Sequence, residues 1–179
     1  AAIYRTERIY GKAGEEVARF LFKREERRIW FLDGTEEYGK AVWQGMQKIF
    51  SKKGCCLEEE QYLEIPKDRD LRRMFYKIRL AGLALSADML VFASAVQGAE
   101  AVGYLHDLEI KVPEEIEVIA VGKEETALIC RPQLTTVEFD KKRLVRQAIE
   151  ELYVQIIKGY ILTKSGKISV KTIIRGSCN

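Results

Sequence analysis

The stretch from Ala87 to Gly122 decides the fold: it reads ADMLVFASA, then VQGAEAVGYLHDLE, and ends in EIEVIAVG. The runs Met89 to Phe92 and Ile116 to Val121 are short, apolar and bounded by polar residues, which is typical of strands buried on both faces. Between them, apolar residues recur at helical spacing, and Pro113 closes the connection. The stretch is therefore predicted to form a strand, a helix and a second strand that lies parallel to the first.

This prediction points to a place where a ligand could bind. In open parallel sheets, ligands bind beyond the carboxyl ends of the strands. Here those ends are Ser94 to Val96 and Val121 to Lys123. They are the first positions at which a binding function is expected.

The composition is that of an ordinary folded domain. The chain has 179 residues, of which 47% are hydrophobic and 32% charged, with a net charge of +3. These values exclude general disorder, and the small charge does not by itself indicate a nucleic-acid surface. No apolar run is long enough to span a bilayer, and the opening residues lack the pattern of a secretion signal, so a cytoplasmic location without membrane contact is expected. The scattered cysteines indicate reduced thiols rather than disulfides or a zinc site, and they are Cys55, Cys56, Cys130 and Cys178.

Helix and strand patterns alternate along the rest of the chain. Helices are predicted over 14–24 and 36–53, then from a cap at Asp68 or Asp70 onward, and from a cap at Asp140 to about Gly159. Strands are predicted over 29–32, 55–65, 134–137 and 168–174. The third of these helices has apolar residues at Leu71, Met74, Phe75, Ile78 and Leu80. The alternation predicts an α/β protein whose mostly parallel sheet is flanked by helices.

Motifs of catalysis are missing from the sequence. There is neither a phosphate-binding loop of the GxxxxGK[ST] type nor a Rossmann fingerprint after a strand. The single histidine, His106, has no nucleophile that can be paired with it, and the acidic run Glu58 to Glu60 is better explained as a solvated strand edge than as a metal or acid–base cluster. We expect a binding domain without catalytic residues, cofactor or metal.

Two segments at the right spacing carry a family resemblance. They are Val112 to Ile119 (VPEEIEVI) and Arg131 to Val137 (RPQLTTV), and weaker matches lie at 15–29, 42–45 and 87–94. From Gly11 to Gly176 the chain resembles the effector-binding domain of lactose/galactose-repressor transcription regulators, which is similar to periplasmic binding proteins.

The resemblance implies a division into two subdomains. Residues 26–133 and 161–179 would form the C-terminal subdomain, and residues 1–25 and 134–160 would supply elements of the N-terminal one. A complete protein would add the first half of the N-terminal subdomain and a helix-turn-helix, so DNA would be bound only through a segment absent from this chain.

The resemblance also transfers ligand positions, at which this chain departs from the family. Val42 stands where an arginine is usual, and Ala95 and Val96 stand where an Asn-Asp pair is usual, or Gln97 and Gly98 in another register. Gly122, followed by Lys123, replaces an aspartate. The remaining candidate positions are Arg8, Lys40 and Ile65.

These departures leave three interpretations open. In the first, the effector is a small molecule less polar than a free sugar, or one bound mostly by the other half of the cleft and by Arg8, Lys40 or Lys123, to which an anion such as a sugar phosphate would be suited. Alternatively the cleft has degenerated and the domain serves dimerisation and is regulated by a protein partner, or the transferred register is off by a residue or two.

For a homodimer, the resemblance points to the central helix and the segment after the next strand. The candidate interface residues are Gln97, Glu100, Ala101, Tyr104, Leu128, Ile129 and Cys130; alternatively they cover the sheet edge within one chain. The expected function is the ligand-sensing and dimerisation domain of a transcriptional regulator. The alternatives are an extracytoplasmic solute-binding protein of a transporter and an α/β enzyme whose catalytic residues lie elsewhere.

Overall fold

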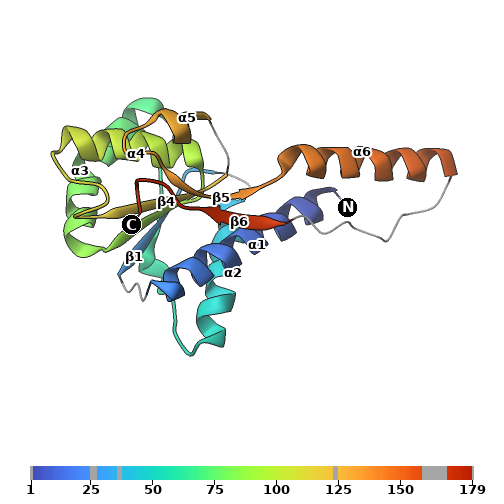
Figure 1. Ribbon diagram of the computed structural model, residues 1–179, viewed down its shortest axis with the longest axis horizontal. Coiled ribbons are helices and arrows are strands. Elements are labelled where there is room, and N and C mark those ends of the chain that lie inside the picture. The colour runs from blue at the N-terminus through green and yellow to red at the C-terminus, as the bar shows by residue number, and fades with distance from the viewer. Residues whose placement is uncertain (1, 25–27, 36–37, 123–124, 159–168, 179) are drawn as a thin grey trace.

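A single six-stranded sheet forms the centre of the molecule (Figure 1). The computed structural model describes residues 2–24, 28–35, 38–122, 125–158 and 169–178. The strand order is β2-β1-β3-β4-β5-β6, and every neighbouring pair is parallel except β5 and β6. The strands are β1 (Ile29–Asp33), β2 (Tyr62–Glu64), β3 (Met89–Phe92), β4 (Glu117–Val121), β5 (Thr135–Phe139) and β6 (Val170–Ile173). The predicted α/β class with a mostly parallel sheet is confirmed.

Helices cover both faces of this sheet. The helices are α1 (Ala2–Lys23), α2 (Gly39–Lys52), α3 (Arg69–Ser86), α4 (Ala95–Asp107), α5 (Glu125–Ile129) and α6 (Lys141–Lys158), with a 3-10 turn η1 (Glu59–Gln61). One core lies between α1, α2 and the sheet, and the other lies between the sheet and α3, α4 and α5. In β1, Phe31 belongs to the first core and Leu32 to the second. This alternation is what a strand buried on both faces requires.

The central prediction, the unit of β3, α4 and β4, is confirmed. Its two strands pair in parallel with Met89 opposite Glu117 and Phe92 opposite Ala120. All four residues of β3 are buried. Two predicted caps are also present: the Asp68 carboxylate accepts hydrogen bonds from the backbone N–H groups of Asp70 and Leu71, and the Asp140 carboxylate accepts one from Arg143 N.

Polar side chains anchor the C-terminal residues against the sheet. The Ser177 hydroxyl donates to the carbonyl oxygen of Val118 at 2.5 Å and accepts a hydrogen bond from Thr135 N at 2.8 Å. Arg175 Nη2 donates to Glu138 Oε1 at 2.8 Å, and both side chains are largely buried. A buried pair of this kind has its charges satisfied, and it fixes the chain after β6 between β4 and β5.

Two sequence-based predictions need correction. The strand predicted over 55–65 is limited to Tyr62–Glu64, because residues 55–58 are irregular and 59–61 form η1. The predicted apolar positions of the third helix do not all face the core: Leu80 is buried, whereas Leu71, Met74 and Ile78 are 57%, 56% and 67% exposed. Helical spacing identified an apolar stripe but not which side of α3 the sheet would cover.

The helix α6 differs from the others in its surroundings. Figure 1 shows it extending away from the sheet and its helical layers. Its exposed apolar side chains are Val145, Ile149, Leu152, Tyr153, Ile156 and Ile157. Among the described residues, no helix combines the length and apolarity that crossing a membrane requires.

Candidate functional site

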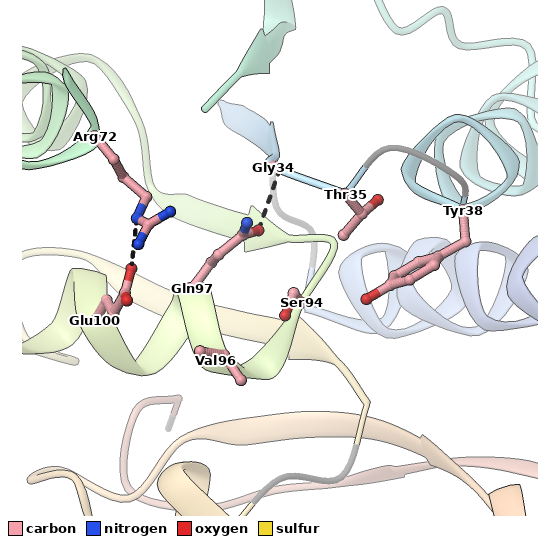
Figure 2. Close-up of a pocket in the computed structure, with 8 residues that line it drawn as sticks. All are labelled: Gly34, Thr35, Tyr38, Arg72, Ser94, Val96, Gln97 and Glu100. Carbon is pink, nitrogen blue, oxygen red and sulfur yellow. Dashed lines mark hydrogen bonds and ion pairs between the residues drawn. The ribbon is translucent and has the colours of Figure 1, made fainter. Parts of the chain in front are cut away.

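The strand order reverses between β1 and β3. From β1 the chain continues through α2 to β2 on one side, whereas β3 lies on the other side of β1 and leads through α4 to β4. The connections after β1 and β3 therefore leave toward opposite faces of the sheet, and a crevice opens between them at the carboxyl ends of the strands. This is where the structure has a cavity of about 370 Å³, lined by Gly34, Thr35, Tyr38, Arg72, Ser94, Val96, Gln97 and Glu100 (Figure 2).

The loop after β1 is held by the carboxylate of Asp33. Asp33 Oδ1 accepts hydrogen bonds from Thr35 N at 2.7 Å and from Thr35 Oγ1 at 2.6 Å, and Oδ2 accepts one from the Tyr62 hydroxyl at 2.5 Å. The Thr35 hydroxyl in turn accepts a hydrogen bond from Gly39 N, at the start of α2. Burial, followed by the hydrogen bond to Asp33, raises the pKa of Tyr62, so this phenol stays protonated and remains a donor. The buried carboxylate of Asp33 thus holds in place the loop that forms this side of the cavity.

Tyr38 enters the cavity from the N-terminal end of α2. Its ring stacks on that of Tyr10 with centroids 4.0 Å apart and an interplanar angle of 12°. Tyr10 also contacts Phe139 edge to face. Tyr10 is thus held between Phe139 and Tyr38, and the Tyr38 ring stacked on it can serve as a wall for a bound molecule.

The other side of the cavity belongs to the first turns of α4. Ser94 precedes the helix as its N-cap residue, and Val96 and Gln97 follow. Gln97 Oε1 accepts a hydrogen bond from Gly34 N at 3.2 Å, so the two loops that flank the crevice are joined (Figure 2). The backbone carbonyl of Gln97 accepts a hydrogen bond from the Tyr76 hydroxyl at 3.4 Å. Gln97 is therefore held from both sides and positioned at the centre of the cavity lining.

An ion pair lies at the edge of the cavity nearest α3. Arg72 Nε is 3.3 Å from Glu100 Oε2, and Figure 2 shows the two side chains reaching toward each other from α3 and α4. Behind them the rings of Tyr76 and Tyr104 pack with centroids 5.1 Å apart. Because Arg72 is paired, the cavity does not present an isolated positive charge to a ligand.

The lining is therefore polar and nearly neutral. It offers hydroxyl, amide and guanidinium groups together with one carboxylate, and these groups can bind a small molecule that both donates and accepts hydrogen bonds. Within the part of the chain that the structure describes, no three His, Cys, Asp or Glu side chains gather in a way that could hold a metal ion. His106 is exposed on α4 and does not line the cavity.

The structure distributes the predicted ligand positions among three places. Val96 lines the cavity, and Ala95 is buried beside it at the start of α4. Gly122 lies at the end of β4 with a φ of 111°, a value that glycine adopts readily and other residues avoid. Val42 and Ile65 are buried in the two cores and have no surface in the cavity.

The predicted basic residues do not meet at the strand ends. Arg8 and Lys40 line a separate hollow of about 820 Å³ along α1 and α2, in which Lys48 forms an ion pair with Glu15. Lys123 lies outside the described residues. The structure thus brings Arg8 and Lys40 together, but away from the cavity that contains Val96 and Gln97.

The predicted interface residues also separate. Gln97 and Glu100 line the cavity, Ala101 is fully buried, and Tyr104 is half-buried against Tyr76. The residues that remain open to solvent are Leu128 and Ile129, which are 40% and 72% exposed, while Cys130 is half-buried.

Sequence reasoning missed several residues of the cavity. Gly34 and Thr35 directly follow the buried strand β1, so the rule that pointed to Ser94 could have pointed to them as well. Tyr38 directly precedes α2 and Arg72 lies on α3, and only the packing of these two helices beside the loops brings them to the cavity. No signal in the sequence alone identifies them.

Comparison with known proteins places this geometry among related structures. Residues 18–178 match the protein family described as periplasmic binding protein-like domain. No curated protein matches the sequence.

Solved structures of similar fold include the transcriptional regulator CelR in complex with cellobiose, at 19% sequence identity and a TM-score of 0.79 over 94% of this chain and 52% of CelR. The Escherichia coli transcriptional repressor AscG is similar at 19% identity and a TM-score of 0.76, over 94% of this chain and 61% of AscG. A LacI-family regulator from Lactobacillus casei with bound sucrose is similar at 18% identity and a TM-score of 0.75, over 94% of this chain and 63% of that protein. The chain therefore spans between about half and two thirds of the length of these proteins.

Proposed function

Because the chain belongs to the periplasmic binding protein-like domain family, we propose that it is the ligand-sensing domain of a transcriptional regulator. The observation that carries the proposal is the cavity at the carboxyl ends of β1 and β3. Polar groups from two loops and three helices converge there, at the point of the sheet where α/β proteins bind ligands. The regulators of similar fold support the same function.

The effector proposed is a small polyhydroxylated molecule. Thr35, Ser94 and Gln97 offer hydroxyl and amide groups at one end, and Tyr38 offers an aromatic wall. Each buried hydroxyl of a ligand needs such partners, because leaving one unpaired costs about 1–3 kcal/mol. The complexes of CelR with cellobiose and of the Lactobacillus casei regulator with sucrose support a sugar over other small molecules.

A phosphorylated sugar is the less favoured effector. Arg72 is already paired with Glu100, and Arg8 and Lys40 line a different hollow. An anion in the cavity would therefore lie near a carboxylate without a free cation among the described lining residues. A neutral polyol meets no such charge.

The remaining parts of the function concern partners. Of the predicted segment 134–160, β5 lies inside the sheet, and we propose that α6 belongs to a second subdomain, because it carries an apolar face that nothing in the described structure covers. Closure of two such subdomains around a ligand would couple binding to a change of shape. DNA would be read by a segment outside these residues, in a cytoplasmic homodimer that catalyses no reaction.

The test is ligand binding by the wild type and by two matched glutamine variants. A thermal-shift and calorimetry screen would include cellobiose, sucrose, glucose and a sugar phosphate. Ligand at about 100 times its dissociation constant stabilises a protein by about 2.7 kcal/mol, which is readily detected. Gln97→Leu should weaken binding of the ligand found by at least about 10-fold, because a buried amide that bonds a ligand is worth about 1.4 kcal/mol or more.

Gln44→Leu is the control, because Gln44 is exposed on α2 and lines the separate hollow. It should leave binding unchanged. Loss of binding in Gln44→Leu but not in Gln97→Leu would move the ligand to the hollow between α1 and α2. Absence of binding by any member of the panel to the wild type would contradict the proposed effector class.

A further inference from the structure

A second pocket lies between the helix α2 and the segment formed by η1 and β2. It has a volume of about 370 Å³ and is lined by Lys40, Trp43, Gln44, Gln47, Glu59 and Tyr62. Lys40, Trp43 and Gln47 follow one another at intervals of three and four residues, so they lie along one side of α2 over about 10 Å. No residue lines both this pocket and the cavity at the strand ends.

Trp43 has an unused hydrogen-bond donor in this pocket. The residue is only 7% exposed, and its indole N–H has no hydrogen-bond partner among the described residues. The indole nitrogen is not one of the fully covered polar atoms that lack a partner, so it stays accessible, and the little surface that Trp43 keeps lines the pocket. The other tryptophan, Trp30, donates to the Ser86 hydroxyl at 3.2 Å, as an indole N–H in a protein usually does. The N–H of Trp43 is therefore available to an acceptor on a bound molecule.

Neighbouring aromatic rings and a carboxylate hold this donor in place. The rings of Trp43 and Tyr62 pack edge to face with centroids 5.6 Å apart, and the Trp43 ring also contacts Phe31. The Tyr62 hydroxyl donates to the buried carboxylate of Asp33. The indole N–H is thus oriented before a ligand arrives, so little conformational freedom is lost on binding.

The pocket also carries one charge of each sign. Lys40 belongs to α2 and Glu59 to η1, and both side chains are exposed. Neither forms an ion pair with the other or with another residue of the described chain. Gln44 and Gln47 add side-chain amides, each of which can donate and accept hydrogen bonds. The pocket thus offers separate partners for an anionic and a cationic group of one small molecule.

We propose that this pocket is a second ligand site and that it binds a free amino acid. The carboxylate of the amino acid accepts hydrogen bonds from the indole N–H of Trp43 and from the ammonium group of Lys40, and its amino group donates to the carboxylate of Glu59. Hydrogen bonds to charged groups are stronger than those between neutral groups, so an amino acid binds better here than a neutral molecule. The Tyr62 ring is the wall against which its side chain packs.

The experiment is a titration of the chain with each of the common amino acids. Calorimetry measures the affinity, and the fluorescence of Trp43 shows that the pocket is occupied, in a Trp30→Phe background that leaves Trp43 as the single tryptophan. At least one amino acid should bind and change this fluorescence saturably. The corresponding amine without the carboxylate and the corresponding acid without the amino group should each bind at least about 10-fold more weakly, because each loses a hydrogen bond between charged groups.

Matched variants test whether the amino acid lies in this pocket. Lys40→Gln and Glu59→Gln should each weaken its binding at least about 10-fold, and both positions are exposed, so folding is preserved. The controls are Lys48→Gln and Glu60→Gln, which remove an exposed charge from α2 and from η1 outside the pocket. They should leave the affinity unchanged. Trp43→Phe keeps a ring but removes the N–H, and it should weaken binding as well.

Three results would overturn the proposal. The first is that no amino acid binds. The second is that the acid without its amino group binds as well as the amino acid, which would make this a site for simple carboxylates. The third is that the control variants lose as much affinity as Lys40→Gln and Glu59→Gln.

The inference goes beyond the proposed function and does not depend on it. An amino acid in this pocket is bound by no residue that lines the cavity at the strand ends. Gln97→Leu, which should weaken effector binding, should leave amino-acid binding intact, so failure of one proposal is distinguished from failure of the other.

Discussion

At the scale of single residues, Gly39 and Asp33 show how the cavity loop depends on close packing. A side-chain carbon at Gly39 would lie 1.9 to 2.1 Å from the carboxylate atoms of Asp33, which is itself 5% exposed. Gly39→Ala must therefore displace a carboxylate that holds Thr35 and Tyr62. We expect it to lower the free energy of unfolding by about 1–3 kcal/mol, as overpacking usually does, and to weaken effector binding.

Urea unfolding of Gly39→Ala and of a control, Gly103→Ala, checks this prediction. Gly103 lies exposed in α4, and a side-chain carbon there meets nothing within 4 Å. Alanine at that position should stabilise the protein by up to about 1 kcal/mol through helix propensity. Equal effects of the two substitutions would show that Asp33 does not confine Gly39.

Because the thiol of Cys178 is buried, we expect the free energy of unfolding to decrease at alkaline pH. Burial raises its pKa to about 12, and its sulfur donates to the carbonyl oxygen of Val118. Because the pKa is higher in the folded than in the unfolded protein, the contribution is fully present below about pH 9 and is lost as the pH rises through 12. The free energy of unfolding should fall above pH 9 by up to about 1.4 kcal/mol per pH unit.

The measurement is unfolding by urea between pH 8.5 and about 9.3, for the wild type, Cys178→Ala and Cys55→Ala. This window lies below the ordinary pKa of the tyrosines, so the raised pKa of Tyr62 and of Tyr76 adds little there. The slope should be smaller in Cys178→Ala and unchanged in Cys55→Ala, whose thiol is exposed. A wild-type slope that persists in Cys178→Ala would assign the pH dependence to other groups.

Residues differ in how far the sequence alone predicts their roles. Caps were predicted at Asp140 and at Asp68 or Asp70, because a cap binds backbone groups two or three residues away, and the structure selects Asp68. Arg72 and Gln97 acquire their places in the cavity from contacts between elements far apart in the chain. Local pattern therefore predicted caps and strand ends, whereas the lining of the cavity depended on tertiary packing.

At the scale of elements, α1 and α2 approach each other closely through glycines. A side-chain carbon at Gly14 would lie 1.9 Å from the carbonyl oxygen of Val42, and one at Gly45 would lie 2.0 Å from that of Gly11. Both contacts are with backbone, which cannot rotate away. Gly45→Ala should therefore force the helices apart and lower the free energy of unfolding by about 3 kcal/mol or more.

Gly11→Ala is the matched control on the same pair of helices. An added carbon there would lie 3.7 Å from the carbonyl oxygen of Ala41, an ordinary contact. It should be neutral or slightly stabilising. Thermal unfolding of both variants decides the point, and a stable Gly45→Ala variant would show that α1 and α2 can separate without loss.

The close approach of α1 and α2 explains the role of a glycine in one of the segments that resemble the family. Val42 to Gly45 resembled a family segment that begins with arginine and ends with glycine. In the structure Gly45 permits the approach of α1, and Val42 is fully buried beneath it. The glycine of that segment thus has a packing role here, while the side chain at position 42 cannot reach a ligand.

Elements also show where periodicity is ambiguous. The unit of β3, α4 and β4 was predicted correctly because its strands are buried on both faces and its helix has one apolar side. The helix α3 has apolar residues on two sides. The same spacing therefore could not show which side faces the core and which is exposed. The intervals of Leu71, Ile78 and Leu85 are as regular as those of a core helix. Only the position of the sheet decides which side is buried.

At the scale of the whole molecule, a core lies on each face of the sheet, whereas the helix α6 keeps its apolar side chains exposed. The strands β1, β3 and β4 contribute residues to both cores, one on each face of the sheet. The helix α6 lies beyond them, with exposed side chains that include Ile149, Leu152 and Ile156. A contiguous exposed patch of this kind marks an interaction surface, and it agrees with the proposed second subdomain.

This arrangement predicts how the chain behaves in solution. It should bind an apolar fluorescent dye such as anilinonaphthalene sulfonate in the folded state, chiefly along α6. A double variant, Ile149→Gln with Ile156→Gln, should lower the dye fluorescence by about half while leaving the melting temperature within about 2 °C, because exposed positions contribute little to stability.

The control is Ile174→Gln, at an exposed residue after β6, and it should change neither quantity. A drop of many degrees in the melting temperature of the double variant would mean that α6 packs against the rest of the chain in solution. If dye binding falls and stability does not, then the apolar face of α6 contributes nothing to this domain on its own. The exposed apolar surface of α6 would then be explained by the subdomain that closes the cavity, and ligand would tighten that contact by holding both sides together.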